Sequence, residues 1–223
     1  MLKLYIANKN YSSWSLRPWL LLHELGVPFE ERLLPFGGNA LRAVSPTGKV
    51  PCLVDGDTTV WDSLAIIEYI AEVTINVWPS ARNARAWARS AVAEMHSGFP
   101  AIRNAFTMNC GIRVHVETFP RPLMHELERL DALWQEGRSR FGGPFLGGKH
   151  FGAVDAFFAP VAFRMQTYSP PISPAAYDYA QLLLQLPWMT RWYEAALQET
   201  WRDAQHEAEA RSAGSWLEDL RAQ

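Results

Sequence analysis

The stretch that decides the fold is Val50-Pro51-Cys52-Leu53-Val54, a short apolar run followed after a turn by Trp61-Asp62-Ser63. Proline has no backbone N–H to donate within a sheet, so a proline at the first position of a strand needs a reason. A cis peptide bond before Pro51 would supply one, because it would turn the main chain of Val50 outward to pair with a peptide-like ligand. The amides of a helix that begins at Asp62 and Ser63 would attract a carboxylate. The two segments together predict a site for a peptide-like, acidic ligand.

The segments around this stretch alternate between strand-like and helix-like patterns. Helices are predicted between Ser15 and Gly26 and from Asp62 to Val73, and strands at Lys3–Ala7, Phe29–Leu34, Val50–Val54 and Thr58–Trp61. This β-α-β, β-β-α order predicts a four-stranded mixed sheet between helices, in a domain that spans residues 1–78. The segment Trp78-Pro79-Ser80 is the expected linker.

Strand patterns nearly vanish in the second half of the chain. Helical patterns cover 81–109, where Pro100 should bend the helix, and then 122–141, 155–166, 177–186 and 187–213. The segment 155–166 is apolar on almost every side, which is typical of a helix buried at the centre of a domain. We therefore predict an all-α domain over residues 84–223.

Charge and composition exclude several classes of function. The net charge of −2 and the absence of a basic run argue against a nucleic-acid surface. No apolar run approaches the roughly 18 residues of a membrane span. Two isolated cysteines, Cys52 and Cys110, form no metal or redox motif and suit a reducing compartment. We expect a soluble, cytoplasmic protein without a metal.

Four motifs, in order along the chain, resemble those of the cytosolic glutathione transferase family. The segment 11–17, Tyr-Ser-Ser-Trp-Ser-Leu-Arg, is similar to the active-site loop of serine-type members, and 45–51, Ser-Pro-Thr-Gly-Lys-Val-Pro, to the family's Asn-Pro-x-Gly-x-Val-Pro segment. Trp61-Asp62-Ser63-Leu64-Ala65-Ile66 resembles its Glu/Asp-Ser-x-Ala-Ile motif. The segment 151–156, Phe-Gly-Ala-Val-Asp-Ala, resembles the start of its buried helix. The resemblance is to zeta-like bacterial members, and it implies a thioredoxin-like first domain.

Two departures from the family pattern stand out. Trp14 replaces the cysteine that follows the two serines in the zeta class, which includes maleylacetoacetate isomerases. Gly152 replaces the usual Ser or Thr at the start of the buried helix. Without that side chain the reciprocal half of a capping box is missing, although Asp155 can still accept backbone amides there.

The resemblance implies roles for individual residues. Ser12, five residues before Arg17, would be the catalytic hydroxyl, with Ser13 as the alternative and Ser15 as a weaker one. The residues expected to bind glutathione are Lys49, Val50, Pro51, Asp62 and Ser63. Each has a plainer interpretation, because the serines could be loop and cap residues, Asp62 and Ser63 a capping pair, and Lys49 a solvated lysine. Arg17 is expected to tie its helix to the second domain.

A second substrate should bind between Trp14 and the first long helix of the second half. Met95, Phe99 and Arg103 recur there at helical spacing, although such a stripe also fits a core. Arg103, a charge amid apolar residues, could meet an acidic substrate. Trp216 either folds back over the cleft or simply packs.

The function that the resemblance implies is conjugation of the glutathione thiolate to small electrophilic, largely apolar substrates. Glutathione would be a co-substrate, no metal would be needed, and the protein would be a homodimer. Two kinds of alternative stay open. One is other glutathione chemistry at the same site, as an isomerase similar to maleylacetoacetate isomerase or as a peroxidase. The other is a non-catalytic binding protein that keeps the fold.

Overall fold

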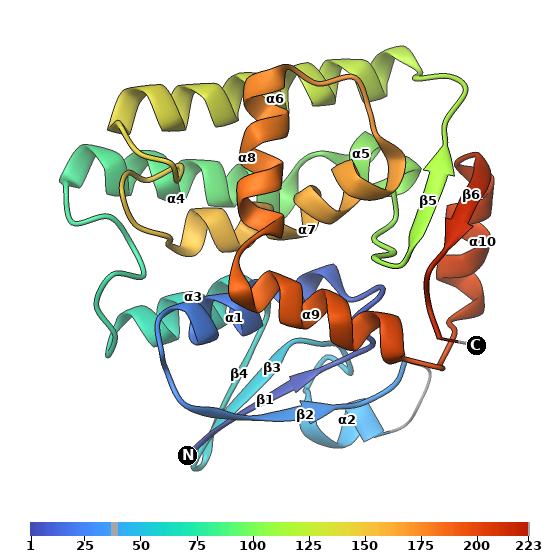
Figure 1. Cartoon of the computed structure of the whole chain (residues 1–223). Helices are drawn as coiled ribbons and strands as arrows, with labels where there is room; N and C mark the ends of the chain where they lie inside the picture. Colours follow the sequence, from blue (N-terminus) through green and yellow to red (C-terminus); the bar gives the residue numbers. More distant parts are fainter. Residues whose placement is uncertain (37–39, 223) are drawn as a thin grey trace.

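The first half of the chain forms a four-stranded mixed sheet with the strand order β2-β1-β3-β4 (Figure 1). The computed structural model describes residues 1–36 and 40–222, so residues 37–39 and 223 of the two predicted domains lie outside it. The strands are β1 (Leu2–Ile6), β2 (Phe29–Leu33), β3 (Cys52–Asp55) and β4 (Thr58–Trp61). Strand β1 pairs parallel with β2 and antiparallel with β3, which in turn pairs antiparallel with β4. This sheet confirms the predicted thioredoxin-like arrangement.

Helices cover both faces of the sheet. The helices α1 (Ser13–Glu24) and α3 (Ser63–Ala71) lie on the face that looks toward the helical domain, and the short α2 (Ala40–Val44) lies on the other (Figure 1). Helix α1 is apolar along most of its length, and its residues from Leu16 to Leu22 are buried. Such a helix is stable only between two packed layers. It therefore brings the loop at its N-terminus to the junction of the two halves.

The second half is helical, as predicted. Its helices are α4 (Arg82–Ser97), α5 (Pro100–Ala105), α6 (Arg121–Phe141), α7 (Ala153–Tyr168), α8 (Pro174–Leu184), α9 (Pro187–Gln198) and α10 (Ala204–Ser212). Helix α7 is central, with Phe157, Phe158 and Phe163 at most 1% exposed. Two of the predicted helices are each divided in the structure, the first at residues 98–99 and the last at 199–203.

The break between α4 and α5 has a local cause. Phe99 adopts a left-handed backbone conformation with φ of 57°, which no helix interior accommodates. Gly98 comes so close to the preceding turn that an added Cβ would lie 2.6 Å from the carbonyl oxygen of Glu94. Arg103 donates to the carbonyl oxygens of Gly98 and Met95, which satisfies acceptors that the end of α4 leaves open. The predicted bend at Pro100 is therefore a full interruption.

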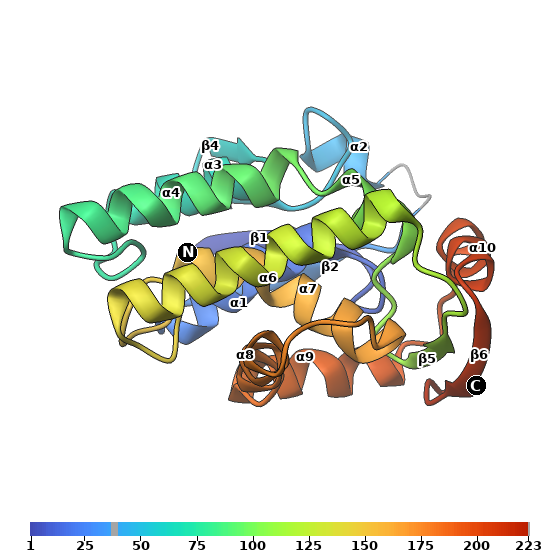
Figure 2. The same cartoon turned by 90° about the horizontal axis from the view of Figure 1, so that it is seen from above.

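The helical half also holds a two-stranded antiparallel sheet, so the prediction of an all-α domain is corrected in this respect. Strand β5 (Ile112–His115) pairs with β6 (Ser215–Asp219), which follows α10 in the chain (Figures 1 and 2). The strands are about a hundred residues apart in sequence, and β6 is largely exposed. A short polar strand with a distant partner carries little local pattern. The small sheet fastens the end of the chain to the body of the protein.

Asp155 organises the start of α7. Its carboxylate accepts hydrogen bonds from the amide of Gly152 at 3.0 Å, the amide of Leu146 at 2.9 Å and the hydroxyl of Tyr179 at 2.7 Å. Gly152 has no side chain to return a bond, so only half of a capping box forms, as predicted. The other two donors come from outside the helix start, and they link α7 to α8 and to the segment before it. None of the described helices is both long and apolar enough to cross a membrane.

Candidate active site

Two hollows meet where the sheet domain faces the helical domain. One of about 440 Å³ is lined by Trp14, Thr47, Lys49, Val50, Pro51, Trp61, Asp62 and Ser63. The other, of about 350 Å³, is lined by Tyr11, Ser12, Ser13, Trp14, Phe36, Leu41, Gly48, Lys49, Val50, Arg103, Thr107, Met108, Arg164 and His206. We name them the helix-tip hollow and the serine hollow. Because Trp14, Lys49 and Val50 line both, the two hollows adjoin each other.

The three serines of the loop differ in their surroundings. Ser12 and Ser13 line the serine hollow, whereas Ser15 is fully buried behind them. The hydroxyl oxygens of Ser12 and Ser15 are 2.7 Å apart, and the hydroxyl oxygen of Ser15 accepts the amide of Ala7 at 3.3 Å. If Ser15 donates its proton to Ser12, the proton of Ser12 is free to point into the hollow. Ser12 precedes α1 but makes no capping bond with its side chain.

Val50 and Pro51 lie where the sheet ends. The peptide bond between them is cis, as predicted. The ladder between β1 and β3 ends at the pair Tyr5 and Cys52, so the main chain of Val50 lies beyond the sheet. Lys49 is exposed and lines both hollows. These residues form one wall shared by the two hollows.

Asp62 and Ser63 form the opposite end of the helix-tip hollow. Asp62 caps α3, because one carboxylate oxygen accepts the amide of Leu64 at 2.8 Å. Its backbone has φ of 75°, a conformation that is costly for a residue with a Cβ and that is found most often at functional sites. The second oxygen of Asp62 lies 3.6 Å from Nε2 of His96. Ser63 is fully buried, and its hydroxyl lies 3.4 Å from a guanidinium nitrogen of Arg17.

Arg17 is held between two aromatic rings. Its guanidinium carbon is 4.1 Å from the ring centre of Trp14 and 4.5 Å from that of Phe157 in α7. Arg17 thus ties α1 to the helical domain, as the sequence predicted. Burial, reinforced by the nearby positive charges of Arg103 and Arg164, holds the pKa of Arg17 well below its usual range.

The residues predicted for the second substrate separate into two groups. Trp14 and Arg103 line the serine hollow, and the guanidinium carbon of Arg103 is 5.0 Å from the ring centre of Trp14. Met95 and Phe99 are buried in the core, and neither belongs to the lining of the two hollows as far as residues 1–36 and 40–222 define it. The carbonyl oxygen of Met95 instead accepts a hydrogen bond from Arg103. Because the helix is interrupted at residues 98–99, Met95, Phe99 and Arg103 do not share one helical face.

Helix α10 contributes a residue that the sequence analysis missed. His206 lines the serine hollow between the rings of Tyr11 and Phe36, with centroid distances of 5.1 and 5.3 Å. Its Nδ1 lies 2.7 Å from a carboxylate oxygen of Asp203. The sequence around His206 gives no indication that this residue lines the hollow. Its contact with Tyr11 joins two residues that are almost 200 positions apart in the sequence.

The C-terminal segment is also bound to the loop that carries the serines. Glu207 accepts hydrogen bonds from the hydroxyl of Tyr11 at 2.7 Å and from the side-chain amide of Asn109 at 3.1 Å. Arg221 forms ion pairs with Glu207 and Asp219 at 2.5 and 2.6 Å. Trp216 lies in β6 and is not part of the described lining of either hollow. It is therefore α10, and not Trp216, that borders the cleft.

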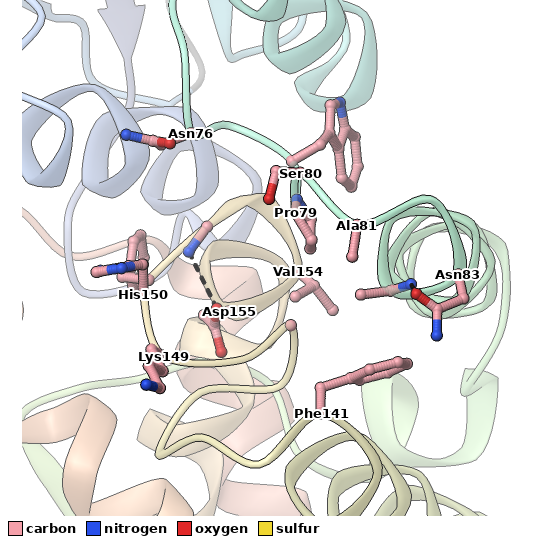
Figure 3. Close-up of a pocket in the computed structure, with 15 residues that line it drawn as sticks. Asn76, Pro79, Ser80, Ala81, Asn83, Phe141, Lys149, His150, Val154 and Asp155 are labelled. Atoms are coloured by element: carbon pink, nitrogen blue, oxygen red, sulfur yellow. Dashed lines mark hydrogen bonds between the residues drawn. The ribbon is translucent and has the colours of Figure 1, made fainter.

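A third hollow of about 420 Å³ lies away from the serines, between the linker and the start of α7 (Figure 3). Asn76 and the linker residues Pro79 and Ser80 form one side, and Val154, Asp155 and Phe141 lie across from them (Figure 3). None of the predicted site residues lines it. Asp155 already has three hydrogen-bond donors, so this hollow presents the capping network rather than an open catalytic group.

The cysteines offer no second reactive centre. Cys52 and Cys110 are both buried and unpaired with each other. Burial raises the pKa of each thiol, which disfavours the thiolate that would be the nucleophile. Within the described part of the chain, no group of three or more His, Cys, Asp or Glu side chains could hold a metal ion.

Comparison with known proteins assigns both halves of the chain. A family model described as "Glutathione S-transferase, N-terminal domain" matches residues 11–73, and one described as "Glutathione S-transferase, C-terminal domain" matches residues 114–195. The glutathione S-transferase-like protein OpS6 of Beauveria bassiana is 26% identical over 190 residues, which cover 78% of this chain and 84% of that protein.

Two solved structures share the fold. A glutathione transferase homologue from Burkholderia strain BGR1, which contains bound glutathione, aligns with a TM-score of 0.66 and 22% identity over 87% of this chain and 97% of its own. A diazinon-metabolizing glutathione S-transferase from the silkworm Bombyx mori aligns with a TM-score of 0.69 and 21% identity over 88% and 97%. Since the two family models follow one another along the chain and span most of it, the chain belongs to the glutathione S-transferase family.

Proposed function

We propose that the protein is a glutathione transferase that joins the glutathione thiolate to a small electrophile. The observation that carries the proposal is that the two hollows adjoin each other and share Trp14, Lys49 and Val50 in their linings. One hollow offers a helix N-terminus, and the other offers the hydroxyls of Ser12 and Ser13. A γ-linked tripeptide has its carboxylate and ammonium at one end and its thiol in the middle, so it can span both.

The helix-tip hollow suits the γ-glutamyl end of glutathione. The first amides of α3 and the hydroxyl of Ser63 would receive the carboxylate, and the exposed carboxylate of Asp62 would face the ammonium. The main chain of Val50 would pair with the cysteinyl backbone of glutathione, since it lies beyond the ladder of the sheet. Pro51 forms the neighbouring wall, and Lys49 would reach the glycyl carboxylate.

The proposed task of Ser12 is to donate a hydrogen bond to the glutathione sulfur. A free thiol has a pKa near 8.5 and is mostly protonated at neutral pH. A donor aimed at the sulfur stabilises the thiolate, and the N-terminus of α1 adds a favourable field. The 2.7 Å contact with Ser15 supports this role, because Ser15 can orient the hydroxyl of Ser12 as a donor. Ser13, which also lines the serine hollow, is the alternative donor.

The reaction that follows is a substitution at an electrophilic carbon. With a chlorodinitrobenzene as acceptor, the thiolate attacks the carbon that carries chlorine, a C–S bond forms, and chloride leaves with the bonding electrons. The protein would contribute the lowered thiol pKa and the close placement of both partners. No step calls for a metal or a nucleotide.

Replacing Ser12 tests the proposal. Ser12→Ala should lower turnover with a chlorodinitrobenzene by about 10²-fold, the usual effect of removing one donor from a developing or stabilised anion, and leave glutathione affinity nearly unchanged. The pH at which kcat/KM reaches half its maximum should rise, because the bound thiol loses a stabilising bond. Ser13→Ala is the matched control, and a loss in Ser13→Ala instead of Ser12→Ala would transfer the role to Ser13.

Glutathione affinity tests the other half of the site. Asp62→Ala and Ser63→Ala should each weaken binding in a calorimetric titration, and unaltered affinity would remove them from the site. Assays with an organic hydroperoxide and a cis-dienoic diacid separate peroxidase and isomerase activity from conjugation. Glutathione binding without any rate enhancement would identify a non-catalytic member of the family.

We further propose that the protein is a cytoplasmic homodimer, as expected from the resemblance.

A further inference from the structure

Two arginines lie against the ring of Trp14, and a third lines the same hollow. Arg17 and Arg103 approach the ring of Trp14, and Arg164 of α7 lines the same hollow as Arg103. None of the three forms a salt bridge among the described residues. Burial and then the charge of Arg103 lower the pKa of Arg164 to about 10. A cluster of like charges is costly to bury, so it needs either a structural reason or an anion.

The two arginines that line the serine hollow, Arg103 and Arg164, have donors to spare. Arg164 donates from Nε to the carbonyl oxygen of Phe106 at 2.7 Å and from Nη1 to that of Pro160 at 3.1 Å. Arg103 donates from Nε and Nη2 to the carbonyl oxygens that end α4. Within the described residues, Nη2 of Arg164 and Nη1 of Arg103 have no hydrogen-bond partner. The main-chain contacts hold each guanidinium in place and leave one terminal amino group of each unused.

The rest of the serine hollow fits an anion attached to an apolar body. Its side chains are aromatic or aliphatic at Trp14, Phe36, Leu41 and Met108, and no Asp or Glu belongs to the described lining. The proposed places for the two carboxylates of glutathione, at the start of α3 and at Lys49, do not use Arg103 or Arg164. The positive charge of the serine hollow is therefore available to the other substrate.

We propose that the serine hollow binds an electrophile that carries a carboxylate, with Arg103 and Arg164 as the groups that bind this carboxylate. The inference rests on the proposed function, in which this electrophile reacts with the glutathione thiolate. It replaces the largely apolar substrate expected from the sequence with an anionic one. A guanidinium with a fixed orientation suits a planar carboxylate better than a flexible ammonium would. The apolar side chains then receive the carbon skeleton and direct its reactive carbon toward Ser12.

A pair of nearly isosteric electrophiles tests the inference. Binding of 4-chloro-3-nitrobenzoate and 4-chloro-3-nitrobenzamide is measured by calorimetry, with and without saturating S-methylglutathione, which cannot react. The wild-type protein should bind the benzoate at least about tenfold more tightly, as expected for one charge-assisted hydrogen bond. Arg103→Gln should remove most of this preference, and Arg103→Lys should keep part of it. Arg113→Gln is the matched control, because Arg113 is a half-buried arginine outside the lining of the hollow.

Equal affinity of the wild-type protein for the two compounds would overturn the inference, and so would an unchanged preference in Arg103→Gln. The wild-type comparison decides the question even if Arg103→Gln fails to fold, a risk because Arg103 also binds the end of α4. The proposed transferase activity fails in a different way. In that case S-methylglutathione does not bind and neither compound reacts with glutathione, while the preference for the benzoate persists.

Discussion

Removing the carboxylate of Asp155 should cost more stability in acid than at neutral pH. The side chain is fully buried at the start of α7, where it accepts bonds from Gly152, Leu146 and Tyr179. Burial raises its pKa to about 6, and the three donors limit the rise. The substitution Asp155→Ala deletes the acceptor and leaves the three donors in the interior.

The magnitude follows from the donors and from the pKa. Three buried donors without an acceptor cost about 3 kcal/mol at pH 7, at roughly 1 kcal/mol each. The folded pKa of about 6 lies above the unfolded value of 3.8, so the stability contributed by Asp155 is fully present below pH 3.8 and is lost as the pH rises through 6. Between pH 7 and pH 4 this linkage adds about 2 kcal/mol to the cost of the substitution.

The assay is urea unfolding of the wild-type and variant proteins at pH 4 and pH 7. Asp131→Ala is the control, since Asp131 binds Ser173 at the start of α8 but has the opposite linkage. Burial acts to raise the pKa of Asp131, yet hydrogen bonds from Gln135 and Ser173 outweigh it and hold the pKa below its usual value. The cost of Asp131→Ala should therefore shrink in acid. A cost of Asp155→Ala that is smaller at pH 4 than at pH 7 would show that the pKa of Asp155 is not raised in the folded protein.

Three further predictions concern the loop, a half-buried histidine and the assembly. Ser15→Ala should lower kcat/KM about fivefold and raise the pH at which it is half-maximal, because one hydrogen bond no longer orients Ser12; a change in stability alone would reduce Ser15 to a packing role. Burial lowers the pKa of His23 to about 4, so stability should be lost as the pH falls from 6.5 toward 4, by about 1 kcal/mol after allowance for solvent screening. The His23→Phe variant should not show this loss of stability between pH 6.5 and pH 4. An unchanged acid dependence would show that His23 does not cause it. Light scattering should find a dimer, and a monomer at micromolar concentration would disprove the expected assembly.

Much of the fold follows from local sequence patterns. The strands around Pro51 and the helix that starts at Ser63 have alternating and helical periodicities that burial reinforces, so both could be predicted. The helix break at Phe99 could not, because it depends on a positive φ and on the guanidinium of Arg103 reaching back to α4. The pairing of β5 with β6 was missed for a similar reason, since each strand is defined by a distant partner. The domain boundaries, residues 1–78 and 84–223, stay a prediction.

The lining of the candidate site was predictable where it is made of neighbouring residues. Ser12, Val50 and Ser63 lie in short motifs, and each lines at least one of the two adjoining hollows. Their roles stay a prediction. Arg164 and His206 were missed, because tertiary packing alone brings α7 and α10 to the loop that carries the serines. Met95 and Phe99 have the right spacing for one helical face. They do not line the hollow, because the helix is interrupted at residues 98–99.

We place glutathione across the two adjoining hollows, with its sulfur at Ser12. A crystal structure of the protein with bound glutathione would test this placement. We expect the γ-glutamyl carboxylate at the start of α3 and the sulfur within hydrogen-bond distance of the hydroxyl of Ser12. Glutathione bound in the hollow beside the linker, or bound with its sulfur away from Ser12, would contradict it.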